Sequence, residues 1–453
     1  MAGHVAVRLV FVESDGSRVP SRIDWTAQQK QRVRAEIDEA LRWWERNLPL
    51  AQLRFSVEEV TLFTGYEPID MRLADEGLWI GDALRDLGLQ GDNYFALAYE
   101  AADQLRKTND SDWATTIFVV ASGGSNGGRF ADDYFAYAYI GGPFLVLTDE
   151  VGPYQQSDLA AVAAHEIAHI FGALDQYRAA RVPCERRSGY LDQPTSNSQS
   201  GNCLLNEPSI MIEPVGSFNH DHIDPAALAQ IGYRDSDGDG IIDPLDTTPE
   251  LRLEAELAAT NRRPSYRGSA RDLAFPTMQQ SATTINRIAR VEYRINGGPW
   301  QFAMADDGSY DSAEEGFTAV PPLYDGTSRL EFRAVNTVGI ASTITQTSVS
   351  ISGVGLEPVY TIDAPPVSAS PILTLSLQAA PGVAQLQLSS DPAFADAPWQ
   401  LFQRDITVQL AAPGAYTYYL RFRDSEGLTS PSYPLLLRYQ PPMPHIYLPL
   451  VRR

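Results

Sequence analysis

The feature that most constrains this chain is a short pattern of ionisable residues inside the alanine-rich stretch 158–177, where His165, Glu166 and His169 stand together. Side chains four residues apart lie on one face of a helix, so a helix here presents both imidazoles to one metal ion. Glu166 lies one step round the helix, where its carboxylate can reach a water at that metal without being a ligand. Two neutral imidazoles and a carboxylate base are the groups that zinc-assisted peptide hydrolysis needs.

The residues after this pattern predict how the helix ends and what completes the site. Gly172 follows His169 by three residues, and glycine tolerates the left-handed conformation that ends a helix. Asp175 then falls where a third ligand returns to the metal. A plainer interpretation also stays open. Two partly buried histidines can be satisfied by the backbone, and Gly-x-x-Asp can be an ordinary helix stop with a capping side chain.

The full pattern, His-Glu-x-x-His-x-x-Gly-x-x-Asp, resembles the metzincin zinc metallopeptidases. It is most similar to the snapalysin-like minority, which has Asp where most metzincins have a third His. The resemblance implies that His165, His169 and Asp175 bind a catalytic zinc ion and that Glu166 is the catalytic base. It also implies an α/β catalytic domain, residues 1–232, with a twisted mixed sheet and an active-site helix.

Metzincins also have a Met-containing turn beneath the zinc site, and Met211 in the segment Ser-Ile-Met is the candidate here. The sequence departs from several branches of the family because no Tyr stands two residues after Met211. The rival geometry is the gluzincin arrangement, in which a later Glu is the third ligand. Glu207 and Glu213 are the acids near the required distance, and both lie in loop-like sequence, so Asp175 is preferred.

Strand and helix patterns alternate before the motif, as an α/β domain requires. The expected strands are residues 5–12, 53–63, 115–121, 135–140 and 144–148, and the expected helices are residues 26–46 and 91–106. In metzincins the sheet edge above the zinc binds the peptide substrate in extended form, and the strand at residues 135–140 resembles that edge strand in order. An extended substrate would pair its backbone with this edge.

Short capping patterns bound the helices around the motif. Ser157 is expected to be the N-cap of the motif helix. Asp224 and Pro225 read as the N-cap and first residue of a short helix that closes the domain. His220 and His222 precede that helix in a loop and are kept as alternative metal ligands.

Both cysteines, Cys184 and Cys203, lie between Asp175 and Met211. This placement predicts one disulfide that closes the intervening loop, with a stabilisation of roughly 3 kcal/mol for a loop of this size. A disulfide implies an oxidising setting, so we expect a secreted, extracellular protein. Two unpaired thiols are the alternative. The start of the chain reads as a strand and not as a signal peptide, so a leader is expected to have been removed.

Residues 235–246 contain a second metal-binding pattern. Its carboxylates are hard oxygen ligands of the kind that Ca²⁺ prefers. They belong to Asp235, Asp237, Asp239, Asp243 and Asp246. The spacing resembles the thrombospondin type 3 calcium repeats rather than an EF-hand, because the twelfth position holds Asp and not Glu. We expect structural calcium to stiffen a linker at residues 233–250. A solvated acidic turn is the alternative.

From about residue 251 the sequence changes to short alternating strands with turn signals and no long helix. We expect two all-β sandwich modules, residues 251–353 and 354–441, which resemble immunoglobulin-like or fibronectin-like modules. The segments 332–342 and 420–430 align as one strand-turn-strand repeat. The modules hold no catalytic cluster, so we expect spacers or contacts with a cell surface or matrix. A Pro-rich tail follows at residues 442–453.

The composition agrees with a folded, acidic, multidomain protein. The chain has 453 residues, enough for about three domains, and 44% of them are hydrophobic. A formal net charge of −22 disfavours nucleic acid and anionic membrane surfaces as partners. No stretch is long and apolar enough to span a membrane.

These features together predict a secreted, monomeric zinc endopeptidase that cleaves protein or peptide substrates and also holds calcium. The alternative from another class is a calcium-dependent surface or adhesion protein whose zinc site is structural or inactive.

Overall fold

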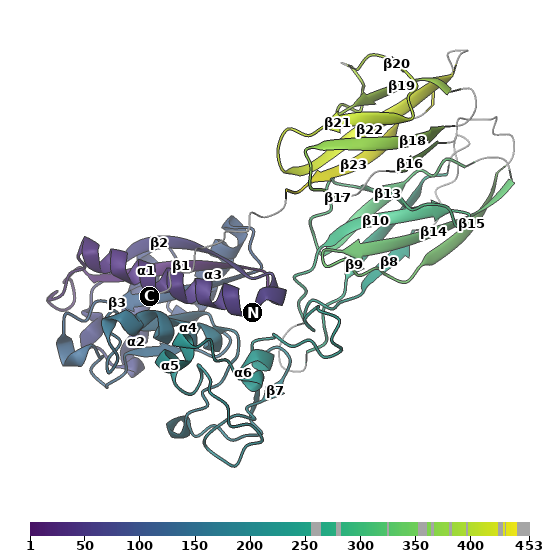
Figure 1. Ribbon diagram of the computed structural model, residues 1–453. Helices are drawn as coiled ribbons and strands as arrows, with labels where there is room; N and C mark the ends of the chain where they lie inside the picture. The colour runs from purple at the N-terminus through teal and green to yellow at the C-terminus, as the bar shows by residue number, and fades with distance from the viewer. Residues whose placement is uncertain are drawn as a thin grey trace, which may run out of the picture. The chain divides into compact units, whose positions relative to one another are not determined.

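The computed structural model describes residues 1–254, 264–277, 282–323, 326–351, 360–363, 367–379, 383–395, 397–424, 429–430 and 432–441. These residues form two compact units, Met1–Thr247 with Ala274–Ile285, and Thr248–Leu273 with Asn286–Arg453 (Figure 1). The first unit contains the predicted domain 1–232 together with the acidic pattern at 235–246. The second contains the predicted β modules 251–353 and 354–441, except for residues 274–285 of the first module, which belong to the first unit. The Pro-rich tail at 442–453 lies outside the described residues.

A five-stranded mixed sheet, in the order β2-β1-β3-β5-β4, forms the centre of the first unit. Its strands are β1 (His4–Ser14), β2 (Arg54–Thr64), β3 (Trp113–Val120), β4 (Ala136–Ala138) and β5 (Phe144–Thr148). The first three and β5 are parallel neighbours, whereas β4 is antiparallel to β5 at the edge. The predicted strands are therefore confirmed, although β4 is shorter than the predicted strand at 135–140.

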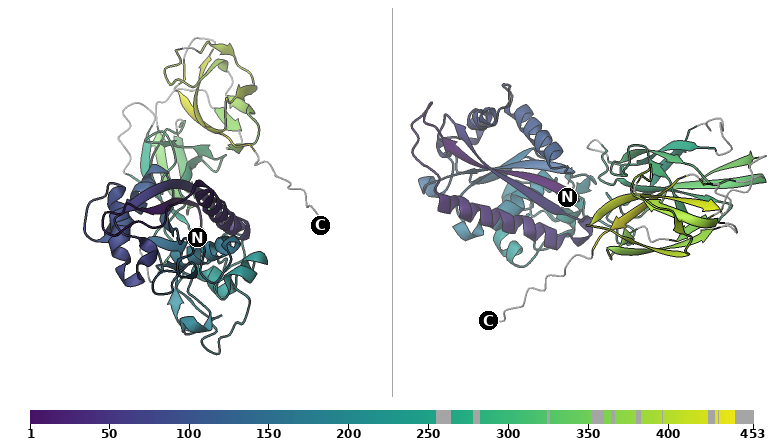
Figure 2. Two further views of the ribbon diagram at one scale, coloured as in Figure 1. Left: turned by 90° about the vertical axis from the view of Figure 1, so that its left-hand side faces the viewer. Right: turned by 90° about the horizontal axis from the view of Figure 1, so that it is seen from above.

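Helices cover both faces of this sheet (Figure 2). They are α1 (Ala27–Asn47), α2 (Glu76–Asp86), α3 (Tyr94–Thr108) and α4 (Leu159–Ile170). On one face α1 packs against α4, and the Trp44 indole N–H donates to the Ala164 carbonyl at 3.0 Å. On the other face α2 and α3 share a core with Val10, Phe118 and Val146. None of the helices that the structure describes is long and apolar enough to cross a membrane.

Two boundaries differ from the sequence-based expectation. Ser157 is not the N-cap of α4, because a 3₁₀ turn at Gln156–Asp158 precedes the helix and Asp158 takes the cap position. The Asp158 carboxylate accepts from the Gln155 N–H at 2.9 Å, which closes that turn first. The helix α2 was not expected, since Gly77 and Gly81 lower its helix propensity.

The chain after α4 contains mostly loop structure held by specific contacts. Cys184 and Cys203 form the predicted disulfide, so the alternative of two free thiols is wrong. The short elements here are β6 (Arg187–Ser188), β7 (Gln193–Pro194), α5 (Pro214–Asn219) and α6 (Pro225–Gln230). Asp224 is the N-cap of α6, as predicted, and its carboxylate accepts from the backbone N–H of Ala226 at 2.9 Å.

The second unit contains two β-sandwich modules. The strands of the first are β8 (Pro249–Leu253), β9 (Tyr266–Asp272), β10 (Ile288–Ile295), β11 (Gln301–Phe302), β12 (Met304–Ala305), β13 (Glu314–Ala319), β14 (Gly326–Asn336) and β15 (Thr345–Ile351). They form the sheets β11-β10-β14-β15 and β12-β13-β9-β8. Phe317 and Phe332 are fully buried in the core of this module. Alternation of buried and exposed residues along β9 matches a two-sheet sandwich.

The second module repeats this plan with its own core, which includes Leu375, Leu420 and Phe422. Its strands are β16 (Tyr360–Asp363), β17 (Val367–Ser368), β18 (Ile372–Ala379), β19 (Val383–Ser389), β20 (Gln400–Leu401), β21 (Asp405–Gln409), β22 (Gly414–Asp424) and β23 (Tyr433–Tyr439). They form the sheets β16-β18-β21 and β17-β23-β22-β19-β20. The chain is therefore multidomain, with immunoglobulin- or fibronectin-like β modules in its second half.

Each copy of the predicted repeat contains the same pair of hydrogen bonds. In the first module the Ser342 N–H donates to the Ala334 carbonyl at 2.8 Å, and the Ser342 hydroxyl accepts from the Ala334 N–H at 3.0 Å. In the second, Ser430 makes the same two bonds with Phe422, both at 2.8 Å. Residues 425–428 of the second copy lie outside the described residues. The repeat is confirmed on either side of them.

Candidate metal centre

Helix α4 carries the motif on its last two turns. The imidazole rings of His165 and His169 lie one turn apart, with centroids 4.9 Å apart and planes at 89°. Both histidines and Glu166 are more than nine-tenths buried. Burying an ionisable group costs free energy unless the group is paired, hydrogen-bonded or bound to a metal ion.

Gly172 ends this helix as the sequence predicts. Its φ of +97° is in the left-handed region, and its N–H donates to the His169 carbonyl at 2.9 Å. The N–H of Ala173 reaches back to the Ala168 carbonyl at 3.0 Å, which completes a Schellman stop. A Cβ on Gly172 would lie 2.6 Å from the Gly189 Cα, so only glycine fits here.

The turn after Gly172 brings Asp175 back to the imidazoles. One carboxylate oxygen, Asp175 Oδ1, lies 3.1 Å from His165 Nε2 and 3.4 Å from His169 Nε2. One ligand atom from each of the three residues lies within 4.8 Å of the other two. The structure therefore brings together the three residues that the motif nominates as ligands.

Backbone carbonyls determine which imidazole nitrogens face this point. His165 Nδ1 lies 2.8 Å from the Ile210 carbonyl, and His169 Nδ1 lies 2.7 Å from the Ala173 carbonyl. A carbonyl only accepts, so each Nδ1 carries a hydrogen and donates it. Each Nε2 then faces Asp175 and, when it is unprotonated, offers its lone pair to a metal ion, as in metal-ligating histidines. Two imidazole nitrogens and a carboxylate oxygen are a donor set that fits zinc.

Hydrogen bonds and opposite charges shift the pKa values of His165 and Asp175. Burial lowers the pKa of His165, but its hydrogen bond to Asp175 and the charges of Glu166 and Asp175 outweigh burial and raise it to about 9. Burial raises the pKa of Asp175, but hydrogen bonds from His165 and His169 hold it well below its usual range. Both shifts favour a positive charge between the imidazole and the carboxylate, which is the charge that a metal ion would supply there.

Glu166 contributes a carboxylate that the rest of the domain leaves open. Among the described residues, its buried Oε2 has no hydrogen-bond partner. Burial raises the pKa of Glu166 above its ordinary value, although His165 and His169 act in the opposite direction. An orphaned buried carboxylate oxygen beside three ligand atoms fits a base that works on a water or a substrate.

The backbone of the turn containing Met211 contacts the candidate ligand His165 and the residue after Asp175. Met211 is fully buried, and its carbonyl accepts from the Gln176 N–H at 2.9 Å, one residue after Asp175. The preceding residue, Ile210, supplies the carbonyl that faces His165. The turn thus lies against both the first and the third member of the group.

Tyr177 is a site residue that the sequence pattern did not single out. Its hydroxyl donates to Asp175 Oδ2 at 3.2 Å, and its side chain is more than one-third exposed. Burial, and then the Asp175 charge, raise the pKa of Tyr177, so the hydroxyl keeps its proton. The available signal was its position two residues after the third ligand.

The alternative ligands lie apart from this centre. Among the described residues, the group that can hold a metal beside α4 includes neither Glu207 nor Glu213. The Glu213 carboxylate instead caps α5 by accepting from the backbone N–H of Gly216 at 2.7 Å. The exposed rings of His220 and His222 stack with centroids 5.6 Å apart, and neither belongs to that group.

The edge strand β4 ends close to α4. The Gly141 N–H, just beyond β4, donates to the His169 carbonyl at 3.0 Å. Tyr137 and Tyr139 pack against the core on the α2 and α3 face of the sheet. In the described part of the sheet β4 pairs only with β5, so its outer edge keeps backbone groups available for a further strand.

The acidic pattern gathers three of its five aspartates. Carboxylate oxygens of Asp235, Asp237 and Asp239 lie within 4.8 Å of one another. Asp243 lies outside this group because Arg234 Nε donates to its Oδ2 at 2.9 Å, which gives the buried carboxylate a cationic partner. Asp246 also lies outside the group.

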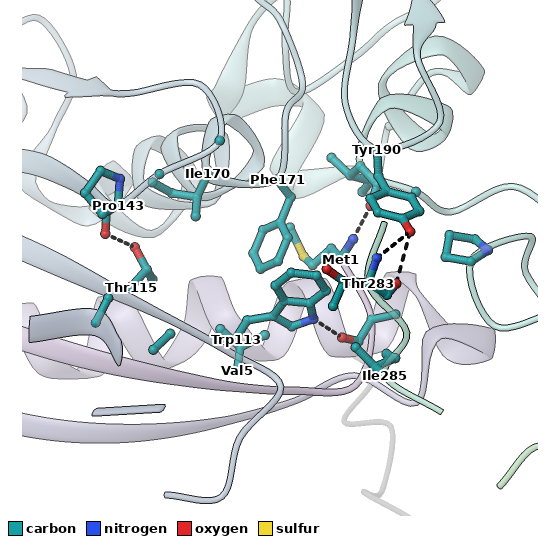
Figure 3. Close-up of a pocket in the computed structure, with 18 of the residues that line it drawn as sticks. Met1, Val5, Trp113, Thr115, Pro143, Ile170, Phe171, Tyr190, Thr283 and Ile285 are labelled. Atoms are coloured by element: carbon teal, nitrogen blue, oxygen red, sulfur yellow. Dashed lines mark hydrogen bonds between the residues drawn. The ribbon is translucent and has the colours of Figure 1, made fainter. Parts of the chain in front are cut away.

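A cavity of about 170 Å³ lies elsewhere in the first unit (Figure 3). Its walls are mainly apolar and include Trp113, Phe171 and Ile285. The Tyr190 hydroxyl accepts from the Thr283 N–H at 3.2 Å at its rim. None of the three candidate ligands lines this cavity, so it is separate from the metal centre.

No family model matches the chain, and no curated protein matches it. Similar solved structures include the fibronectin(III)-like modules of CbhA from Clostridium thermocellum, with 10% identity over 42% of this chain and 95% of that one, at a TM-score of 0.16. Dimeric latent PorU from Porphyromonas gingivalis has 11% identity over 42% of this chain and 20% of that one, at a TM-score of 0.21. The central fibronectin-III array of RIM-binding protein has 14% identity over 44% of this chain and 70% of that one, at a TM-score of 0.16. These TM-scores are too low to support an argument, so the sandwich modules are identified from their strand pairing.

Proposed function

We propose that the first unit is a zinc-dependent endopeptidase. The observation that carries the proposal is the convergence of His165, His169 and Asp175, with both Nδ1 hydrogens held by carbonyls and both Nε2 atoms facing Asp175. Glu166 stands beside them, buried, with one oxygen that has no hydrogen-bond partner in the described part of the chain. Three protein ligands and one open position are typical of catalytic rather than structural zinc sites.

The residues divide the work of peptide hydrolysis. A zinc ion held by the two imidazoles and Asp175 supplies Lewis acidity, which polarises a carbonyl and acidifies water. Glu166 Oε2 removes a proton from the attacking water while the new C–O bond forms. It then gives that proton to the leaving nitrogen as the C–N bond breaks. Burial raises the pKa of Glu166 above its ordinary value, which strengthens the carboxylate as a base towards the water.

The substrate is an extended peptide segment. The outer edge of β4 offers backbone donors and acceptors next to α4, and strand addition recognises the main chain of a peptide with little demand on its sequence. We therefore propose that unfolded or loop segments of proteins are cleaved.

The combination of features favours a metzincin-like peptidase. The motif helix ends at a Gly stop, an Asp returns as the third ligand, a buried Met turn lies against the ligands, and a mixed sheet ends in an antiparallel edge strand. Any one of these is common, whereas their assembly around one point matches what the resemblance implies.

Two further parts of the proposal rest on other residues. The cluster of Asp235, Asp237 and Asp239 supports calcium binding after the catalytic domain. The disulfide between Cys184 and Cys203 supports function in an oxidising, extracellular compartment.

Removal and return of the metal test this proposal. The full chain is incubated with unfolded casein before and after zinc is stripped by a chelator, and again after zinc is returned. We expect cleavage that disappears on stripping and returns with zinc. A chain that retains about one zinc ion but cleaves neither casein nor a random peptide library would favour the structural-zinc adhesion protein instead.

A further inference from the structure

The segment His222–Asp224, just before α6, makes two hydrogen bonds to the turn Ser209–Met211, which we call the Met211 turn. The Ser209 hydroxyl donates to Asp224 Oδ2 at 2.6 Å and accepts from the Met211 N–H at 3.2 Å. The Ile210 N–H donates to the His222 carbonyl at 3.0 Å. The three residues of the turn are therefore each tied by a hydrogen bond of their own.

Asp224 is fixed as firmly as the turn it holds. It is 1% exposed, and its other oxygen accepts from the backbone N–H groups of Ala226 and Ala227 at 2.9 and 3.2 Å. Both carboxylate oxygens are thus occupied, one by the start of α6 and one by Ser209. Hydrogen bonds to an ionised acceptor are the stronger kind, so this carboxylate resists displacement.

The held turn carries the carbonyl that faces the first candidate ligand. The Ile210 carbonyl accepts from His165 Nδ1 at 2.8 Å, and this bond keeps the hydrogen on Nδ1 and the lone pair on Nε2. A carbonyl cannot be removed by mutation. Its position is set by the residues that anchor the turn, which are Ser209 and Asp224.

We propose that the Ser209–Asp224 pair is a positioning device for His165 that sets the affinity of the centre for zinc. This inference rests on the proposed function and deepens it. It also assigns a role to Asp224 beyond capping α6. Partners of ligating histidines typically change metal affinity about 10- to 100-fold when they are lost.

The test replaces Ser209 by Ala in the full chain and measures zinc affinity by competition with a chromophoric chelator. The change removes the link between the turn and Asp224 and leaves every candidate ligand in place. We expect zinc binding about 10- to 100-fold weaker than in the wild type. The absorption bands of the cobalt-substituted protein are expected to change as well, because the orientation of one imidazole becomes less constrained.

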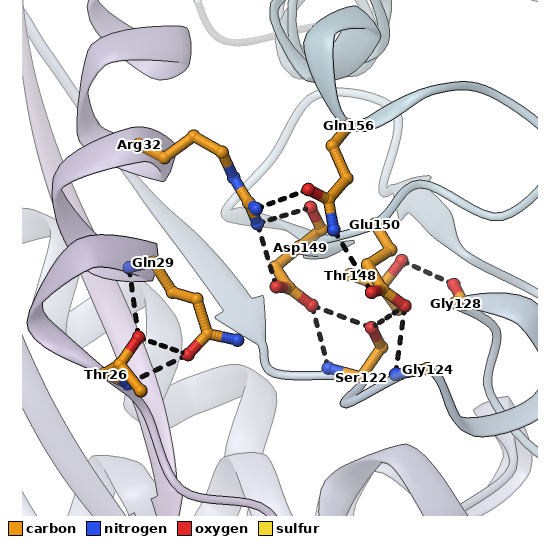
Figure 4. A network of polar contacts seen from close by, with 10 residues as sticks. All are labelled: Thr26, Gln29, Arg32, Ser122, Gly124, Gly128, Thr148, Asp149, Glu150 and Gln156. Carbon is orange, nitrogen blue, oxygen red and sulfur yellow. Dashed lines mark hydrogen bonds and ion pairs between the residues drawn. The ribbon is translucent and has the colours of Figure 1, made fainter.

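The chain offers a matched control at Ser122 (Figure 4). The Ser122 hydroxyl is fully buried and lies 2.8 Å from Asp149 Oδ1, and Asp149 is 1% exposed like Asp224. This pair belongs to a network with Arg32 and Glu150, and it contacts none of the candidate ligands. Ser122→Ala removes a buried Ser–Asp hydrogen bond of the same kind, so we expect a similar loss of stability with unchanged zinc affinity.

Asp224→Ser provides a second variant in case Ser209→Ala does not fold. Ser is a good N-cap, so α6 keeps its start, but its one short side-chain oxygen caps the helix and leaves no second oxygen to accept from the Ser209 hydroxyl. Zinc affinity in either variant equal to that of Ser122→Ala would overturn the inference and leave the proposed function standing. A wild-type chain that binds no zinc would overturn both.

Discussion

Replacing Gly172 by Ala should damage both the fold and the metal centre. A non-glycine residue in the left-handed conformation costs about 1–2 kcal/mol. The new Cβ would also lie 2.6 Å from the Gly189 Cα and 3.0 Å from its backbone nitrogen, so one backbone must move. Overpacking of this kind typically costs a further ~1–3 kcal/mol. We expect a total loss of about 2–5 kcal/mol and weaker zinc binding, because the displaced turn carries Asp175.

Gly88 makes it possible to separate these two costs. It ends α2 with a φ of +99°, and its N–H and that of Leu89 make the same Schellman bonds that end α4. A Cβ on Gly88 meets nothing within 4 Å. Gly88→Ala should therefore lose only the conformational cost, about 1–2 kcal/mol, with unchanged zinc affinity.

Urea unfolding of the full chain, followed by tryptophan fluorescence, compares the two variants, because Trp43, Trp44 and Trp79 are buried in the first unit. Zinc affinity is measured in parallel. Equal destabilisation by Gly172→Ala and Gly88→Ala would refute the close-approach argument. Unchanged zinc affinity in Gly172→Ala would refute the link between the helix stop and the third ligand.

Three other changes have defined outcomes. Replacing Cys184 and Cys203 together by Ser opens a loop with a sequence separation of 19, and should lower the unfolding free energy measured by urea titration by roughly 3 kcal/mol. An unchanged unfolding free energy would show that other contacts already order the loop. Tyr177→Phe removes the hydroxyl that donates to Asp175 Oδ2, and should lower kcat/KM about tenfold while zinc remains bound. An unaltered kcat/KM would show that the Tyr177 side chain contributes only packing. Asp235→Asn with Asp239→Asn should abolish calcium binding in isothermal titration and leave zinc content unchanged, and calcium affinity equal to that of the wild type would place the ion elsewhere.

The helix of the metal centre could be predicted because its signals are local. Gly172 stops the helix through its own conformation, and His165 and His169 share a face through helical spacing alone. The return of Asp175 depends on a turn only a few residues long. The N-cap of this helix was less predictable. The choice between Ser157 and Asp158 depends on a 3₁₀ turn at Gln156–Asp158 that precedes the helix in the chain.

Contacts between distant segments limited the remaining predictions. The acidic pattern offers five equivalent aspartates, and only the fold shows that Arg234 occupies Asp243. The same holds for Ser209 and Asp224, whose side chains meet across a loop. The contact between Tyr177 and Asp175 is local, because the two residues stand only two positions apart, so the sequence could have predicted it.

The sequences of the two β modules share more than the predicted repeat. The alignment of 332–342 with 420–430 is confirmed by equivalent serine hydrogen bonds. A second shared signal is Pro-Trp-Gln, which contains Trp300 in one module and Trp399 in the other. Arg333 Cζ lies 4.1 Å from the first ring, and Arg423 Cζ lies 4.4 Å from the second. In each module the arginine of a neighbouring strand therefore makes a cation–π contact with this tryptophan.

The assignment of Glu166 as the catalytic base can be tested by comparing the hydrolysis of unfolded casein by the wild type and by Glu166→Gln at equal zinc content. The substitution keeps the size of the side chain and removes its ability to take a proton. Our account predicts that both proteins hold about one zinc ion per chain and that the variant loses at least about a hundredfold in kcat. Equal cleavage by both proteins at equal zinc content would contradict the assignment of Glu166 as the base, and with it the proposed mechanism.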